Sequence, residues 1–344
     1  MGITADRAFW QAESANIELL HTTIGDLVDQ QAAVFPDKEA LVYHYPERGL
    51  DLRLTYRELR DEVNRVARGL LALGIEKGEH VAVWAPNVPE WIFLELALEK
   101  IGAVLVTVNT AYRAAELEYL LRQGDITTLF MVEELRDNSY LDSVYAIVPE
   151  LRAMRNLASE TLHSAALPHL KRVILLGEAS RPGCLRYAHM VDLSRSVPDE
   201  MLATRQRSIA PDDAAQIQYT SGTTGFPKGA IISHAGHLNS AYLFAARKGI
   251  QSSDRMVSAM PLFHVAGCVG GLLKMLVTGG TLIPLITFDP AKQLELISHE
   301  QATLCWGCPQ CSWPCSTTLA FWLASSTRPH CAWSSVEGRL CRWC

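Results

Sequence analysis

Apolar residues recur along the first third of the chain with two alternating spacings, one typical of helices and the other of buried strands. Between residues 59 and 73 they stand three or four positions apart, which predicts a helix. Thr55 and Glu58 match a capping box at its start, and Gly74 suits its end. Similar patterns predict further helices at 89–98 and 114–123 and buried strands at 80–84, 103–108 and 127–132.

The middle of the chain, 133–210, is less regular and contains several prolines. We expect a helix near 139–158 and a strand at 172–176 there. Alternation then returns, with strands expected at 254–260, 281–285 and 303–306 and helices at 265–277 and 290–299. Helices that alternate with continuously apolar strands predict an α/β fold, in which largely parallel sheets are covered by helices.

The composition is that of a globular protein: 49% of the 344 residues are hydrophobic and 20% are charged. A formal net charge of −6 gives no indication of a nucleic-acid partner, which usually requires a basic excess. The stretch 256–273 has no Asp, Glu, Lys or Arg, but it contains Pro261 and several glycines, so it favours a buried strand, turn and helix over a membrane span. Asp6 and Arg7 stand where a signal peptide would be apolar, and we therefore expect a cytoplasmic protein without a transmembrane segment.

The most informative segment is 219–229, YTSGTTGFPKG, which lies between two expected strands. Its glycines leave backbone N–H groups accessible to a polyphosphate, while its hydroxyl groups and Lys228 add hydrogen-bond donors and positive charge. The string is not a Walker A loop, because Gly222 and Gly225 are separated by two residues and Lys228 precedes a glycine. A glycine-rich hairpin turn without a ligand is the alternative, but the ordered string favours phosphate binding.

This string resembles the signature phosphate loop of the adenylate-forming (AMP-binding) superfamily, which includes the acyl-CoA synthetases. Three further segments resemble motifs of that family in the expected order: 54–59 (LTYREL), 102–121 (GAVLVTVNTAYRAAELEYLL, in the fatty-acyl-CoA-synthetase style) and 261–267 (PLFHVAG). The resemblance covers roughly residues 20–307. It implies the helix-covered, largely parallel sheets of the family's N-terminal domain, here incomplete and without the small C-terminal domain.

The resemblance also implies a two-step reaction on a small-molecule carboxylic acid, expected to be a fatty acid. ATP and the acid give an acyl-adenylate and pyrophosphate, and coenzyme A then displaces AMP to form a thioester; Mg²⁺ would neutralise the phosphates. By resemblance the candidate catalytic residues are Lys228, Thr224 and His264, with His264 near the adenylate and the acyl group. The expected phosphate contacts are Thr220, Ser221, Gly222, Thr223, Thr224, Gly225 and Lys228.

The composition changes abruptly near residue 307. Cys184 and Cys268 are the only cysteines before residue 305, whereas the last 40 residues contain Cys305, Cys308, Cys311, Cys315, Cys331, Cys341 and Cys344. The family's later motifs, Tyr-Gly-x-Thr-Glu and Thr-Gly-Asp, do not occur after Gly229. We therefore expect a partial AMP-binding domain at 1–307, followed at 308–344 by a poorly ordered tail whose coding sequence has been read out of frame.

Two groups of residues could instead hold a metal. Cys305, Cys308, Cys311 and Cys315 have the spacing of ferredoxin cluster ligands or could close a zinc site, but Ser316 replaces the proline that usually follows. His234 and His237 lie three positions apart at an expected helix start, but only two ligands are visible, which favours ordinary surface or capping histidines. We predict no metal site of the protein's own.

Two further alternatives concern His264 and the activity. A lone histidine between Phe263 and Val265 is more often a packed core residue, and only the resemblance makes it a site candidate. The chain could also be a catalytically dead fragment that binds nucleotide weakly. Acid-dependent exchange between ATP and pyrophosphate distinguishes that fragment from an active ligase.

Overall fold

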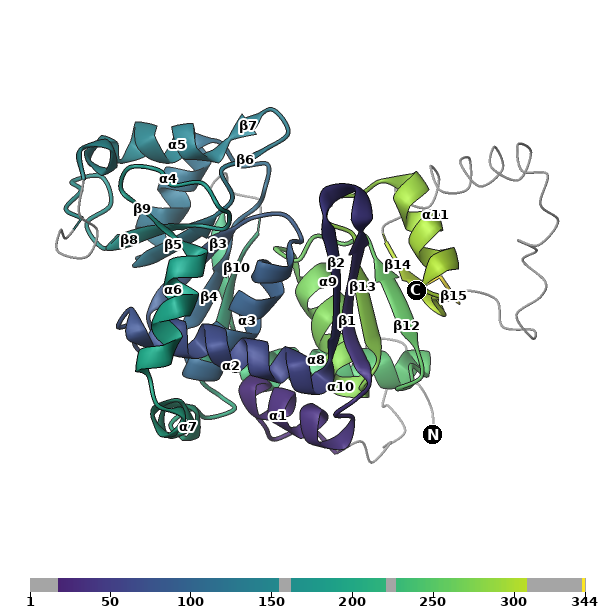
Figure 1. The fold of residues 1–344 in the computed structure, drawn as a ribbon. Coiled ribbons are helices and arrows are strands. Elements are labelled where there is room, and N and C mark those ends of the chain that lie inside the picture. Colours follow the sequence, from purple (N-terminus) through teal and green to yellow (C-terminus); the bar gives the residue numbers. More distant parts are fainter. Residues whose placement is uncertain (1–17, 155–161, 221–226, 308–341, 344) are drawn as a thin grey trace, which may run out of the picture.

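The computed structural model describes residues 18–154, 162–220, 227–307 and 342–343. Within this part of the chain, two large β-sheets lie side by side, with helices between them and around them (Figure 1). A short hairpin of β6 (Glu134–Leu135) and β7 (Asn138–Ser139) stands apart from both sheets. The arrangement confirms the predicted α/β fold.

The seven-stranded sheet is parallel except at one edge. Its strands follow the order β11 (Lys228–Ser233), β10 (Ala214–Thr220), β4 (Val104–Thr107), β3 (His80–Trp84), β5 (Thr128–Met131), β8 (Arg172–Leu175) and β9 (Cys184–Arg186). Only β10 and β11 run antiparallel, as a hairpin. The carboxyl ends of β10, β4, β3 and β5 therefore lie at one edge of the sheet and their amino ends at the other.

The six-stranded sheet is also mainly parallel. Its order is β15 (Arg342–Trp343), β14 (Leu304–Trp306), β12 (Arg255–Ser258), β13 (Thr281–Pro284), β1 (Glu39–Tyr45) and β2 (Leu50–Thr55). The β1–β2 pair is antiparallel and the other pairs are parallel. The sheet thus combines strands from both ends of the described chain.

Helix α3 (Pro89–Ile101) lies at the centre of the main core. Every residue of this helix except Glu90 is buried, which agrees with a sequence that is apolar on almost every side. It contacts α1 (Ile24–Val34), α2 (Tyr56–Ala72) and strand β4. The main hydrophobic core includes Leu41 and Leu282 of one sheet and Val83 of the other, so one core joins the two sheets.

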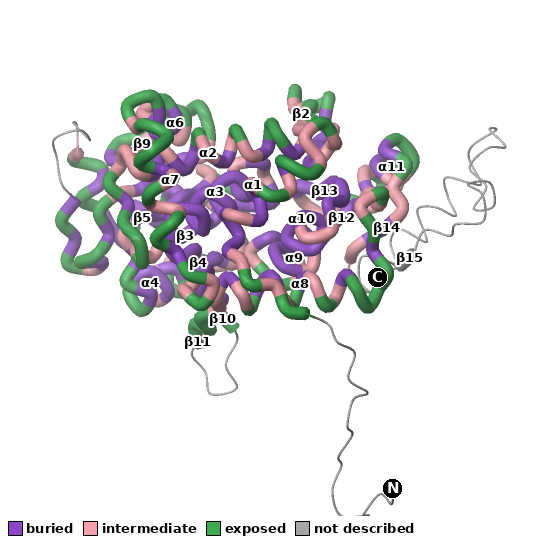
Figure 2. The backbone as a smooth tube through the Cα atoms, turned by 90° about the horizontal axis from the view of Figure 1, so that it is seen from below, coloured by how far each residue is buried: buried purple, intermediate pink, exposed green. Residues whose placement is uncertain are grey.

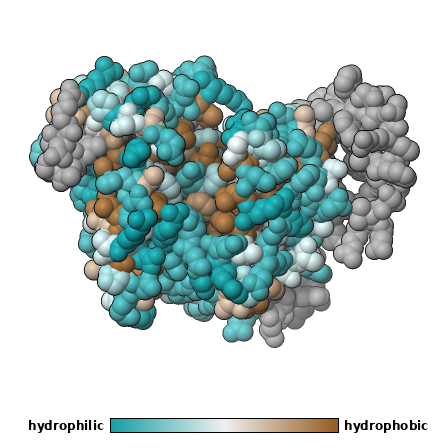
Figure 3. All heavy atoms as spheres, viewed as in Figure 1, coloured by the Kyte–Doolittle hydropathy of each residue, from teal (hydrophilic) through white to brown (hydrophobic). Residues whose placement is uncertain are grey.

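The other helices cover the outer faces of the sheets or connect their strands. A second core packs α4 (Ala114–Gln123) and α5 (Tyr140–Ile147) on the far side of the seven-stranded sheet, and a third packs α11 (Pro290–His299) on the six-stranded sheet. Figure 3 shows hydrophobic residues in the middle of one face, between the two sheets, and hydrophilic residues around them. The remaining helices are α6 (Tyr187–Leu193), α7 (Asp199–Arg207), α8 (His234–Lys248), α9 (Val265–Gly267) and α10 (Lys274–Thr278).

Most of the elements predicted from periodicity are confirmed. The Thr55 hydroxyl accepts a hydrogen bond from the Glu58 amide while the Glu58 carboxylate accepts one from the Thr55 amide, which is the predicted capping box of α2. Gly74 follows this helix with φ of +74°, a conformation that favours glycine. Asp289 caps α11 as its sequence indicates.

Two predicted helices differ from the structure. The helix expected near 139–158 ends at Ile147, because Pro149 cannot continue its hydrogen bonding and a 3-10 turn over Pro149–Ala153 follows; residues 155–161 lie outside the described part. The helix expected at 265–277 is three consecutive pieces: α9, a π-helical segment at Cys268–Leu273, and α10. No helix in the described part of the chain is both long and apolar enough to cross a membrane.

Two carboxyl groups on α3 are enclosed in the main core. Glu95 and Glu99 are fully buried, and the Gln216 side-chain amide donates to one oxygen of each, at 2.8 and 3.0 Å. Burial raises the pKa of Glu95 to about 8, and burial together with the neighbouring Glu95 raises the pKa of Glu99 well above its ordinary value. Both groups are therefore protonated at neutral pH.

This burial predicts a fold that weakens as the pH rises. The unfolded chain releases these protons near pH 4.5, whereas the folded chain releases that of Glu95 only near pH 8 and holds that of Glu99 well above its ordinary pKa. The contribution to stability is therefore complete below about pH 4.5 and is lost as the pH rises. We expect Glu99→Gln to reduce this loss by about 1.4 kcal/mol per pH unit in urea unfolding measured between about pH 5 and 8. The exposed Glu178→Gln is the control, and equal pH slopes for wild type and Glu99→Gln would contradict the prediction.

Candidate functional site

The flanks of the predicted phosphate loop lie at the carboxyl edge of the seven-stranded sheet. Strand β10 ends at Thr220, beside the carboxyl end of the parallel strand β4, and β11 begins at Lys228. Thr220 and Lys228 face each other as paired residues of the hairpin, and both are exposed (Figure 2). Ser221, Gly222, Thr223, Thr224 and Gly225 lie outside the described residues.

Helix α4 holds the base of this hairpin from one side. The Tyr119 hydroxyl donates to the Pro227 carbonyl at 3.2 Å, and the Tyr219 hydroxyl bonds the side chain of Gln123. Gly229 pairs with Tyr219, and a Cβ at this glycine would come within 2.8 Å of the Ile217 side chain. Lys228 forms no ion pair with another described residue. Lys228 is itself exposed, at the first position of β11.

His264 lies at the start of α9 and is exposed, so the core reading of this residue is wrong. Its Nδ1 accepts a hydrogen bond from the Ala266 amide at 3.1 Å, which leaves Nε2 as the site of the proton in the neutral ring. The turn behind it is tight: a Cβ at Gly267 would lie 2.0 Å from the Pro261 carbonyl oxygen. The described contacts fix the backbone and one nitrogen of His264 and leave the other nitrogen available.

Asn87 is a positioning residue that the sequence analysis missed. Its side-chain amide donates to the carbonyls of Met260 (3.0 Å) and Leu285 (2.9 Å), and its Oδ1 accepts from the Leu262 amide at 2.8 Å. A buried asparagine just after strand β3 therefore supports the segment that leads into His264. The sequence did contain a signal for this role, because Asn87 is a polar residue between Pro86 and Pro89, just after an apolar strand.

The expectation that His234 and His237 lie at the surface is wrong, although the His234 Nδ1 does accept the amide of Ile24, the first residue of α1, at 3.4 Å. Both are buried at the start of α8, where Ser233 is the N-cap residue. Burial lowers the pKa of His234 to about 4 and that of His237 to about 3, because charged imidazolium is poorly solvated there. Both rings are neutral at physiological pH and serve the packing of α8.

Within the described residues, one group of side chains has the composition of a metal site: His44, His299 and Glu300. Its carboxylate is already engaged, since Glu300 bonds Arg53 and Arg255. Burial raises the pKa of Glu300, but the hydrogen bonds from Arg53 and His299 outweigh burial and lower it to about 2. The group is an ion-pair cluster of the six-stranded sheet. Cys305 is buried in β14, and the other cysteines of the predicted cluster spacing lie outside the described residues.

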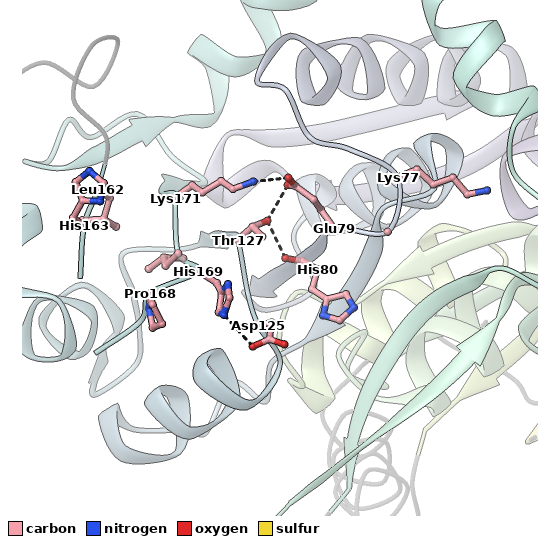
Figure 4. Close-up of a pocket in the computed structure, with 12 residues that line it drawn as sticks. Lys77, Glu79, His80, Asp125, Thr127, Leu162, His163, Pro168, His169 and Lys171 are labelled. Atoms are coloured by element: carbon pink, nitrogen blue, oxygen red, sulfur yellow. Dashed lines mark hydrogen bonds and ion pairs between the residues drawn. The ribbon is translucent and has the colours of Figure 1, made fainter. Parts of the chain in front are cut away.

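A separate cavity of about 590 Å³ lies at the amino edge of the seven-stranded sheet (Figure 4). Most of its charged lining is already paired: Lys171 bonds Glu79 at 2.6 Å, His169 lies 3.5 Å from Asp125, and Lys77 bonds Asp213 outside the cavity at 2.7 Å. Thr127 also donates to Glu79 at 3.0 Å. Because parallel strands begin at this edge and end at the other, the cavity and the phosphate-loop hairpin lie at opposite edges.

The sequence comparisons identify the family. The AMP-binding enzyme family matches residues 28–312, and the chain belongs to it. YngI of Bacillus subtilis (strain 168) is 40% identical over 292 residues, which cover 85% of this chain and 52% of YngI. The mitochondrial medium-chain acyl-CoA ligase ACSF2 of Mus musculus is 36% identical over 297 residues, 85% of this chain and 47% of that protein. The chain spans about half the length of the curated relatives it matches.

Solved structures agree with this assignment. The N-terminal domain of FACL13 from Mycobacterium tuberculosis superposes with a TM-score of 0.60 and 28% identity, over 83% of this chain and 62% of that one. A long-chain-fatty-acid-CoA ligase (FadD1) from Archaeoglobus fulgidus shares the fold, with a TM-score of 0.71 and 23% identity over 89% of this chain and 55% of that one. The predicted family and fold are confirmed, while the site residues and the boundary at residue 307 stay predictions.

The buried histidine predicts sensitivity to acid. The unfolded chain gains a proton on His237 near pH 6.5 and the folded chain only near pH 3, so stability is lost as the pH falls between these values. We expect His237→Leu to lose less stability than wild type on going from about pH 7 to pH 4, by up to about 1.4 kcal/mol per pH unit. Urea unfolding monitored by circular dichroism measures this. The exposed His163→Leu is the control, and a steeper acid loss in His237→Leu would show that the ring is not buried neutral.

Proposed function

We propose that the chain carries the ATP-binding part of an acyl-CoA synthetase. The reaction joins a carboxylic acid to ATP with release of pyrophosphate, and coenzyme A then displaces AMP from the acyl-adenylate to give a thioester. The observation that carries the proposal is the hairpin whose paired ends are Thr220 and Lys228, in a chain of the AMP-binding enzyme family. The medium-chain acyl-CoA ligase ACSF2 supports the acid–thiol ligase class.

The first step needs charge stabilisation more than covalent chemistry. A carboxylate that attacks the α-phosphate must overcome repulsion between two anions, and the departing pyrophosphate gathers negative charge. The Lys228 ammonium and the hydroxyls and amides of Thr220, Ser221, Gly222, Thr223, Thr224 and Gly225 are the donors that we assign to these oxygens. Thr224 and Lys228 bind the oxygens that gain charge in the transition state.

Mg²⁺ supplies further neutralisation of the phosphates when it is bound with ATP. At the described ends of the hairpin, Thr220 has a hydroxyl group and Lys228 an ammonium group. Neither side chain is a carboxylate that could bind the ion. We therefore assign no protein ligand of the ion to this part of the chain. Lys228 and the loop amides act on the phosphate oxygens directly.

We propose that the acid is a fatty acid. We also propose that the reaction takes place in the cytoplasm. The segment after His264, with Val269 and Leu272 among its buried residues, is apolar. His264 is assigned to the adenylate and acyl side, where its Nε2 would donate a hydrogen bond. The relative ACSF2 is named as a medium-chain acyl-CoA ligase, which supports an aliphatic acid.

Nucleotide binding without turnover is the second candidate function. The sequence contains the phosphate loop but neither Tyr-Gly-x-Thr-Glu nor Thr-Gly-Asp after Gly229. A chain with the phosphate donors alone would bind ATP through its phosphates and would not hold the ribose or exclude water from the acyl-adenylate. We retain 1–307 as the partial domain and 308–344 as an out-of-frame tail within this proposal.

Exchange of radiolabelled pyrophosphate into ATP, with a fatty acid and Mg²⁺ present, tests the proposal. We expect acid-dependent exchange in the full chain and a loss of about a hundredfold or more in Lys228→Ala, because a charged donor to the leaving group is removed. Lys248→Ala removes an exposed lysine at the end of α8 and should leave the rate unchanged. ATP binding without exchange would instead support the second candidate, and exchange that is indifferent to Lys228→Ala would contradict the assigned role.

A further inference from the structure

A chain of buried polar side chains joins the strand that leads into the phosphate loop to the turn that carries His264. Gln216 and Gln218 of β10 and Cys268 of the π-helical segment are at most 7% exposed. On one side the chain ends at the two carboxyl groups of α3, Glu95 and Glu99, which accept from Gln216. These groups are enclosed where α3, β10 and the segment after His264 meet.

The hydrogen bonds run continuously through this chain. The Gln218 side-chain amide donates to the Gln216 Oε1 and to the Cys268 Sγ, both at 3.0 Å. The Cys268 thiol donates to the His264 carbonyl oxygen at 3.4 Å. The same carbonyl accepts from the amides of Gly267 (2.7 Å) and Cys268 (3.1 Å), so it is fixed from several directions. Gln218 lies two residues before Thr220 and Cys268 four residues after His264.

We propose that Gln218 and Cys268 are positioning residues, which hold the phosphate-loop strand against the His264 turn and so set the spacing of the two halves of the nucleotide site. The inference deepens the proposed function and rests on it for the roles of the loop and His264. Neither side chain touches substrate; both act through the backbone of residues that do.

Strand geometry explains why polar side chains serve this purpose. Gln216 and Gln218 point to one face of β10, while Ile217 and Tyr219 point to the other and pack in the core beneath α4. A shift of β10 by one residue would bring the glutamine amides into that apolar core and leave them without partners, which is costly. The network therefore fixes one register of β10 relative to Cys268. Apolar residues of the same volume could fill this space without specifying a register.

The Cys268 thiol can donate its hydrogen bond to the His264 carbonyl over a wide pH range. Cys268 is fully buried, and burial, together with the negative charge that Glu95 acquires above about pH 8, raises the pKa of its thiol well above the ordinary value. The groups that face it are the side chains of Gln216 and Gln218 and, beyond them, Glu95 and Glu99. The thiol stays protonated and keeps a hydrogen for the His264 carbonyl.

Hydrogen exchange followed by mass spectrometry tests the positioning directly in the full-length chain. We expect Gln218→Leu and Cys268→Ala each to speed amide exchange about tenfold at both 264–268 and the hairpin strands 217–220 and 228–231. Exchange in α5, on the other side of the sheet, should not change. Cys184→Ala is the matched control, because it removes another buried cysteine, in β9.

The conservative variant Cys268→Ser separates positioning from packing. Cys268→Ser keeps a hydroxyl donor for the His264 carbonyl. We therefore expect it to show the wild-type pattern of amide hydrogen exchange and the wild-type rate of pyrophosphate exchange. Cys268→Ala, in contrast, should lower kcat several-fold with little change in the KM for ATP. The proposal is overturned if only the mutated segment exchanges faster, if α5 changes equally, or if Cys268→Ser behaves as Cys268→Ala. A wild-type chain without pyrophosphate exchange would contradict the proposed function alone, since the amide measurements still decide whether the two segments are coupled.

Discussion

The burial of helix α3 between two sheets is the constraint on which the rest of the structure depends. A helix enclosed on almost every side is apolar over most of its surface, and α3 brings strands from both sheets into one core. This core fixes where β10 stands relative to the segment after His264. The position of the phosphate-loop hairpin therefore follows from packing that is distant from the hairpin itself.

The polar groups inside this core give it a defined arrangement. Glu95 and Glu99 remain protonated because burial disfavours their charge, and Gln216 satisfies one oxygen of each. From Gln216 the hydrogen bonds continue through the Gln218 amide to Cys268, whose thiol donates to the His264 carbonyl. Apolar packing thus brings the elements together, and a small set of buried hydrogen bonds joins β10 to the segment after His264, which carry the two parts of the proposed site.

Local signals in the sequence predicted the fold and the family well. Periodicity and motifs indicate features that depend on residues close together in the sequence. Such features are the capping box of α2, the strands at 80–84 and 103–108 and the string at 219–229. Pairing between distant residues leaves no such signal, so the bonds of Asn87 to Leu262 and of Gln218 to Cys268 were not foreseen. For the same reason His234 and His237 were expected at the surface: three-residue spacing does not show which face of α8 is buried.

The central claim is that the chain holds its nucleotide by the phosphates, at the hairpin of β10 and β11 at the carboxyl edge of the sheet. Calorimetric titration of the full chain with ATP, repeated with inorganic pyrophosphate or adenosine as competitor, tests this most directly. The account predicts that pyrophosphate displaces ATP and that adenosine at the same concentration does not. Displacement by adenosine but not by pyrophosphate would contradict it.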